Sequence, residues 1–141
     1  MKTKKVNRYY CEFCKKANCS ASSISTHEKS CTLNPNRFCG MCAKLDLPQA
    51  KMDDLLAILP KPEIQEDGMW GSSISNIEHV EKSMAELRGL SNNCPACIMA
   101  TIRQKGFPVP AIESFNFTKE CEKLWTDYNN AQFRSSDYAN W

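Results

Sequence analysis

The chain has 141 residues, of which 42% are hydrophobic and 24% charged, so a packed core is possible and wholesale disorder is excluded. No apolar run approaches the roughly 20 residues of a membrane-spanning helix, and the basic start, MKTKKVNRYYCEFC, lacks the apolar stretch of a signal peptide. We therefore expect a soluble protein of the reducing cytoplasm. Its formal net charge is +2, but residues 1–42 carry eight basic and two acidic residues, and the rest of the chain is net acidic.

Changes in composition along the chain predict four segments. Residues 1–8 are a basic arm, and residues 9–38 contain a first group of cysteines and a histidine followed by the turn-rich link TLNPNRF at 32–38. Residues 39–132 contain two further cysteine pairs between helical patterns. Residues 133–141, FRSSDYANW, form an aromatic tail.

Four stretches show apolar residues at helical spacing. The first lies in PQAKMDDLLAIL (48–59) and precedes a proline- and glycine-rich loop at 60–73. The second has Ser75 or Asn76 as its N-cap, carries the stripe Ile77, Val80, Met84 and Leu87, and is expected to stop at Gly89.

The third helical stretch follows the Cys-Pro-Ala-Cys sequence and ends at Gly106. Residues 107–117 then read as extended, and a final helix covers 118–132. These patterns predict a small, mainly α-helical protein in which the apolar stripes form the core.

The first ligand group has the spacing Cys-x2-Cys-x12-His-x3-Cys, from Cys11, Cys14, His27 and Cys31. Cys-x2-Cys brings two sulfurs together, and residues four apart share one face of a helix. The pattern resembles the C2H2 zinc finger in its CCHC variant, which implies a zinc-stapled ββα unit over residues 9–31. Tyr9 and Ile24 occupy apolar positions of that family, whereas Asn18 stands where the family usually has a core aromatic residue.

Nine cysteines in a reducing compartment favour metal binding over disulfides. After the first group is assigned, two pairs remain, and we expect them to share a second zinc ion: Cys39, Cys42, Cys94 and Cys97. A knuckle joined to a Cys-x2-Cys at a helix start resembles the treble-clef arrangement. Three alternatives stay open: a redox-active dithiol in Cys-Pro-Ala-Cys, and His79 or Cys19 as a replacement ligand.

Two zinc ions, each with four protein ligands, would be structural, because a closed site has no free coordination position. We therefore expect a non-enzymatic adaptor or regulatory protein that binds nucleic acid weakly through its basic N-terminal part. The residues expected to contact phosphates or stack on bases are Lys2, Lys4, Lys5, Arg8, Tyr9, Tyr10, Lys15 and Lys16.

The finger resemblance places the base-reading positions on Ser20, Ser23 and Thr26. These small polar residues can bond to several bases, and the arginine that reads guanine is missing. The sequence therefore predicts little base specificity.

Two other functions remain open. The acidic C-terminal part, Trp70 and the aromatic tail suggest a protein-interaction module. Residues 9–42 resemble parts of small phage-encoded zinc-binding proteins. This resemblance implies that the partner is a host protein. His79, after Glu78 and ahead of a Cys-x2-Cys pair, loosely resembles the His-Me finger endonucleases, although that family needs a hairpin where this stretch looks helical. The sequence indicates no membrane partner and leaves the oligomeric state open.

Overall fold

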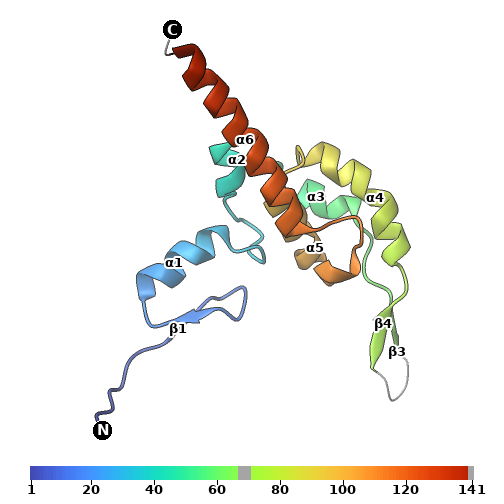
Figure 1. The fold of residues 1–141 in the computed structure, drawn as a ribbon. Helices are drawn as coiled ribbons and strands as arrows, with labels where there is room; N and C mark the ends of the chain where they lie inside the picture. Colours follow the sequence, from blue (N-terminus) through green and yellow to red (C-terminus); the bar gives the residue numbers. More distant parts are fainter. Residues whose placement is uncertain (67–70, 140–141) are drawn as a thin grey trace.

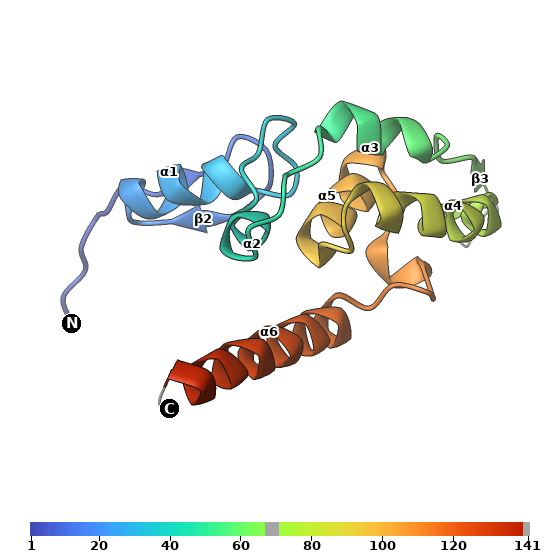
Figure 2. The same ribbon diagram turned by 90° about the horizontal axis from the view of Figure 1, so that it is seen from above.

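The computed structural model describes residues 1–66 and 71–139. A small N-terminal unit lies beside a larger helical body, and the long C-terminal helix runs along the body and extends past its end (Figures 1 and 2). Residues 1–8 extend away from the N-terminal unit without regular structure (Figure 1). Among the described residues, no helix is both long and apolar enough to cross a bilayer.

The N-terminal unit consists of two very short strands and one helix. Strand β1 (Tyr9–Tyr10) pairs antiparallel with β2 (Ala17–Asn18), and helix α1 (Ala21–Ser30) follows. Ser20 is the N-cap of α1, because its side chain accepts a hydrogen bond from the backbone N–H of Ser23. The buried side chain that α1 contributes is Ile24. So small an apolar core cannot stabilise the unit by itself.

The helical body contains the other helices. These are α2 (Gly40–Lys44), α3 (Met52–Ile58), α4 (Ile77–Leu90), α5 (Pro95–Lys105), the 3₁₀ turn η2 (Val109–Ala111) and α6 (Phe117–Ala139). Its core is one cluster of buried residues from α3, α4, α5 and the segment before α6. The cluster also includes the second group of cysteines, so that group is continuous with the apolar core.

The predicted apolar stripes of α3 and α4 lie in the core, whereas the apolar residues of α6 between Cys121 and Tyr128 are only half-buried. Val80, Met84 and Leu87 of α4 are buried at 3% exposure or less, and Leu55 of α3 is fully buried. Helix α5 begins at Pro95 and ends before Gly106, whose φ of 96° lies in the left-handed region that glycine adopts without strain.

The expected helix stop at Gly89 was wrong. Helix α4 continues to Leu90, and the chain reverses after it through Asn92 and Asn93, whose φ angles are 56° and 58°. Asparagine tolerates this left-handed conformation better than most residues do. A helical glycine that is exposed, as Gly89 is, lowers helix propensity without ending the helix.

The expected loop at 60–73 contains a hairpin. Strand β3 (Ile64–Glu66) pairs antiparallel with β4 (Ser72–Ile74). The Asn76 side chain holds the base of this hairpin, since it donates to the carbonyl of Lys61 at 2.7 Å and accepts from the N–H of Glu63 at 3.1 Å. Asn76 therefore begins α4 without a side-chain cap hydrogen bond to the helix.

The C-terminal segments also differ from expectation. The segment 107–117 is not extended throughout, because it contains the η2 turn and buries Phe107, Ile112 and Phe115. The last helix does not end at residue 132, because the backbone of α6 remains helical to Ala139. Most of the expected aromatic tail is therefore a continuation of α6, while Trp70 lies outside the described residues.

Candidate metal centres

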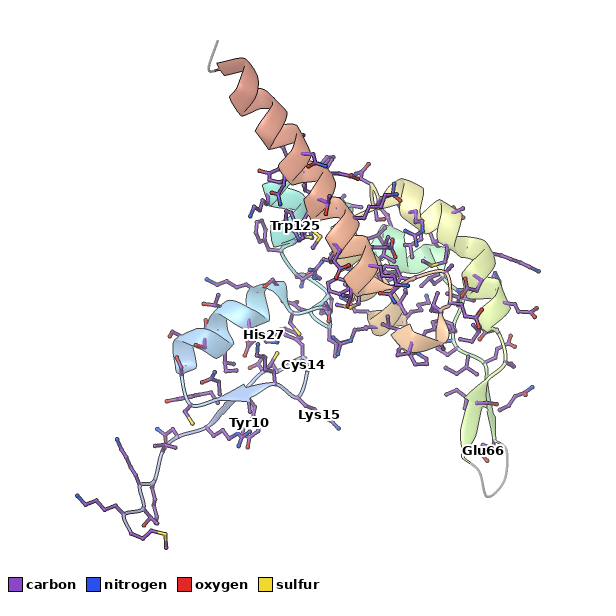
Figure 3. The ribbon with its side chains drawn as sticks, viewed as in Figure 1. Tyr10, Cys14, Lys15, His27, Glu66 and Trp125 are labelled. Atoms are coloured by element: carbon purple, nitrogen blue, oxygen red, sulfur yellow. The ribbon has the colours of Figure 1, made fainter. Side chains whose placement is uncertain are left out.

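The first candidate metal centre joins the strand hairpin to helix α1. Cys11 and Cys14 lie in the turn between β1 and β2, while His27 lies on the last turns of α1 and Cys31 is its C-cap. One ligand atom from each of the four lies within 4.8 Å of all the others. Figure 3 shows His27 and Cys14 facing each other across the unit, with Nε2 of the ring 3.2 Å from Sγ. The structure thus brings together the four residues that the spacing grouped.

Local hydrogen bonds shape this centre. The N–H groups of Phe13 and Lys16 each point at a cysteine sulfur, at 3.4 Å from Cys11 Sγ and from Cys14 Sγ respectively. Such N–H donors in a Cys-x2-Cys turn stabilise thiolates. At Asn18, where the resembled family has an aromatic residue, the side chain instead accepts from the N–H of Ser20 at 2.9 Å, which shapes the turn into α1.

The second candidate metal centre lies where two helix starts meet. Cys39 is the N-cap of α2 and Cys42 lies on that helix, while Cys94 is the N-cap of α5 and Cys97 lies in its first turn. The four sulfurs lie within 4.8 Å of one another. All four residues are at most 2% exposed. Two pairs separated by more than fifty residues therefore converge in the core.

The thiols of the second centre perturb one another strongly. Hydrogen bonds from Cys94 and Cys97 lower the pKa of Cys39. Burial, together with hydrogen bonding to Cys94, raises the pKa of Cys42 to about 12. Hydrogen bonds with Cys39 and Cys94 also raise the pKa of Cys97. The raised pKa values of Cys42 and Cys97 disfavour their thiolates unless a cation lies among the four sulfurs.

Both centres fit a tetrahedrally coordinated divalent ion. With metal–sulfur bonds of about 2.3 Å, the sulfurs of a tetrahedron lie about 3.8 Å apart. The sulfurs of Cys39 and Cys94 are 3.5 Å apart, and those of Cys42 and Cys97 are 3.6 Å apart. Sets of Cys₄ and Cys₃His are those that zinc prefers. Each set is therefore suitable for one metal ion.

The alternative ligands lie outside both groups. Cys19 is exposed, and His79 is exposed on the first turn of α4 beside Glu78. Neither belongs to a group of potential ligands among the described residues. The segment around His79 is helical, as expected, and not the hairpin that the resembled endonucleases need.

The residues expected to contact nucleic acid are all exposed. Tyr10 has 63% of its surface exposed, and the guanidinium of Arg8 lies 5.9 Å from the centre of its ring. Figure 3 shows Tyr10 and Lys15 pointing outward from the hairpin. Phe13, which the sequence reading missed, is 37% exposed on the same turn. Phe13 could have been identified from the sequence, because it is an aromatic residue in the otherwise polar turn Glu-Phe-Cys-Lys-Lys.

Two further residues near the second centre were also missed. Arg37 is buried beside Cys97, and Gln49 bridges the backbone of Arg37 and Cys39. Arg37 lies in a turn-rich stretch without periodicity, and Gln49 is a polar residue at the start of the stretch 48–59, so no sequence pattern marked either of them. No family model, curated protein or solved structure matches this chain significantly.

Proposed function

We propose that this protein is a zinc-binding, non-enzymatic adaptor that binds nucleic acid weakly through residues 1–31. In this proposal residues 9–31 act as a ββα-type CCHC finger, and the pairs at 39–42 and 94–97 form a treble-clef-like zinc site. Each ion would have four protein ligands and no open position, so zinc would stabilise the fold and would not activate a water or substrate.

The observation that carries this proposal is the exposed aromatic and basic surface around the first centre. Tyr9, Tyr10 and Phe13 are 38%, 63% and 37% exposed, and Lys15 and Lys16 are exposed on the same turn. Aromatic faces stack on unpaired bases, and neighbouring cations contact phosphates. The basic arm before Tyr9 extends this surface. The arrangement favours a single strand over a duplex, because the bases of a duplex are already stacked.

The helix of the finger supports low base specificity. Ser20 is already engaged as the N-cap of α1 and hydrogen bonds to Ser22 Oγ at 3.1 Å. Ser23 and Thr26 are exposed but short. Since none of the three carries the bidentate donor pair that reads guanine, phosphate and stacking contacts should dominate.

The test is fluorescence anisotropy with labelled 20-nucleotide single strands of mixed sequence and the matched duplex, titrated over a range of salt. Nonspecific Kd values of about 10⁻⁴–10⁻⁶ M at physiological salt are expected, with a log–log salt slope of roughly −2 to −4 for three or four neutralised phosphates. Changing Lys2, Lys4, Lys5 and Arg8 to glutamine should flatten the slope.

A matched control removes four exposed lysines outside this surface, at Lys51, Lys61, Lys82 and Lys119. It changes the net charge by the same amount and should leave the slope unchanged. Absence of binding to single strands and duplex at low salt would contradict the proposal. A protein partner for the exposed Tyr10 and Phe13 would then be the stronger candidate, to be sought by pull-down with and without nuclease treatment.

A further inference from the structure

Arg37 is a buried cation in the link between the two candidate metal centres. It lies in the segment 32–38, six residues after Cys31 and two before Cys39, and is 7% exposed. Arginine is rarely buried without a partner of opposite charge, because the loss of hydration costs several kcal/mol. The group beside the guanidinium of Arg37 is therefore expected to carry negative charge.

The backbone at Arg37 is fixed on both sides. Its N–H donates to the carbonyl of Asn34 at 3.2 Å, and its carbonyl accepts from Gln49 Nε2 at 2.8 Å. The Oε1 atom of the same Gln49 accepts from the N–H of Cys39 at 2.6 Å. One glutamine thus couples the backbone of Arg37 to a ligand residue, and the guanidinium is held at the second centre.

The guanidinium contacts a sulfur and, within the part of the chain that the structure describes, forms no ion pair with a carboxylate. Its Nη1 lies 3.8 Å from Cys97 Sγ, and its buried Nε has no hydrogen-bond partner. Among the described residues, the carboxylate that forms an ion pair is that of Glu120, and its partner is Arg88, not Arg37. Asp53 lines the same surface hollow as Arg37 but forms no ion pair with it. The available countercharge is therefore the cysteine group.

Four thiolates around one divalent ion leave two negative charges in a buried site. We propose that Arg37 is the electrostatic partner of the second metal centre, in which it donates to Cys97 Sγ and offsets one of those charges. Arg37 acts through the ligands and does not bind the metal, so it is a positioning residue. This inference rests on the second zinc site of the proposed function and does not depend on nucleic-acid binding.

Two consequences distinguish this role from simple packing. Removal of the positive charge should weaken metal retention at the second centre and leave the first centre unaffected, since the contact is to Cys97. Loss of a partner that hydrogen bonds to a metal ligand typically lowers metal affinity about 10- to 100-fold. A positive charge of different shape should restore part of that affinity, whereas an apolar side chain of similar length should not.

The test compares the full-length wild type with Arg37→Met and Arg37→Lys. Each zinc-loaded protein is titrated with a chromophoric chelator, and helix content is checked by circular dichroism. The same variants are loaded with cobalt(II), because the sulfur-to-cobalt charge-transfer bands report on the charge around the thiolates. Asp53→Asn is the control for the other charged side chain at this hollow.

For the folded Arg37→Met protein we expect one of two zinc ions to be lost at about 10- to 100-fold lower chelator concentration, with shifted cobalt bands. Arg37→Lys should lie closer to wild type, and Asp53→Asn should equal it. Wild-type retention and bands in Arg37→Met would overturn the inference, as would equal losses in the Met and Lys variants. A wild type that binds one ion or none would instead overturn the zinc part of the proposed function.

Discussion

The side-chain amide of Gln104 on α5 donates to the backbone carbonyl of Thr32, seventy-two residues earlier, at 2.9 Å. The same nitrogen lies 3.0 Å from the carbonyl of Asn34. Asn34 in turn donates through its own side chain to the carbonyl of Glu28 in α1. The link between the two centres is therefore bound to the helical body and to the N-terminal helix, so the two units should tumble as one.

Gln104→Ala should release the link from α5. The substitution removes two hydrogen bonds to backbone carbonyls, each contributing about 1 kcal/mol, while the contact of Arg103 with Thr32 remains. We expect residues 9–31 to acquire a shorter rotational correlation time than the helical body in ¹⁵N relaxation measurements. Gln65→Ala, at an exposed glutamine of β3, should leave the two correlation times equal. Identical relaxation in Gln104→Ala and wild type would show that this contact does not hold the units together.

Metal content should be about two equivalents of zinc per chain in protein purified without chelator, because two separate ligand groups are present. Cys31→Ala should retain about one equivalent and lose order mainly in residues 9–31, whose apolar core is minimal. Cys94→Ala should also retain about one equivalent but unfold the helical body, since Cys94 lies in its core. Elemental analysis and NMR spectra measure these outcomes.

Cys19→Ala, at an exposed cysteine outside both groups, is the control and should keep both ions. A metal-free wild type that still unfolds cooperatively would contradict this prediction.

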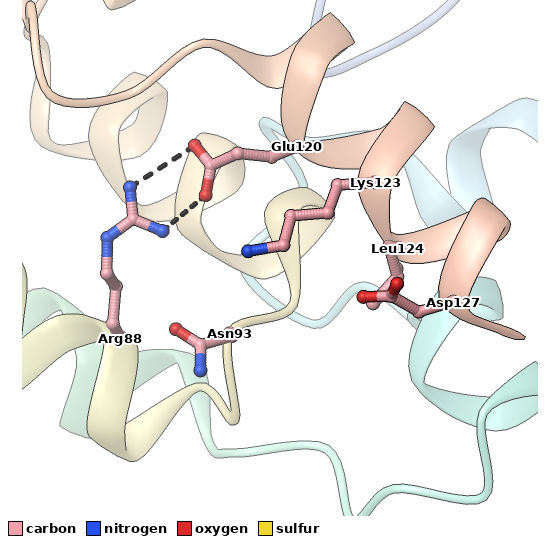
Figure 4. A pocket seen from close by; sticks show the side chains of 6 residues that line it. All are labelled: Arg88, Asn93, Glu120, Lys123, Leu124 and Asp127. Atoms are coloured by element: carbon pink, nitrogen blue, oxygen red, sulfur yellow. Dashed lines mark hydrogen bonds and ion pairs between the residues drawn. The ribbon is translucent and has the colours of Figure 1, made fainter.

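Glu120→Ala should loosen the attachment of α6. Glu120 forms a bidentate ion pair with Arg88 (Figure 4). Arg88 also donates to the carbonyl of Ser114. Hydrogen bonding to Glu120 raises the pKa of Arg88, which favours the charged guanidinium. The pair is about three-quarters buried, and we expect a loss of about 1 kcal/mol in the free energy of unfolding by urea.

Glu122→Ala, at an exposed glutamate of the same helix, should change the free energy of unfolding by less than about 0.5 kcal/mol. Equal effects of the two substitutions would be evidence against the ion pair.

His79 should not act as a nuclease base. It is exposed on a helix, and neither candidate metal centre includes it. Incubation with supercoiled or branched DNA and magnesium should therefore leave the substrate intact on a gel. Cleavage by the wild type that disappears in His79→Ala would restore the endonuclease alternative, whereas cleavage retained in both would indicate a contaminant.

The members of both ligand groups could be predicted from the sequence alone. Cys11 and Cys14 lie in one tight turn, and His27 and Cys31 lie four residues apart on one helix, so short-range spacing fixes their geometry. The remaining pairs at 39–42 and 94–97 followed by elimination. The buried stripe of α4 and the glycine end of α5 were likewise readable, because helical periodicity and left-handed glycine are local properties.

The contacts that join these parts could not be predicted, because they form between residues far apart in the sequence. From its neighbours in sequence, Arg37 would be an exposed cation in a polar turn. In the folded chain its guanidinium lies beside Cys97. Gln104 reads as an ordinary helical residue, and only the folded chain brings the carbonyl of Thr32 to it. The hairpin at 64–74 depends on Asn76 holding distant backbone groups. Periodicity and ligand spacing report on neighbours in sequence, whereas burial of a charge and side-chain hydrogen bonds depend on residues that meet only when the chain has folded.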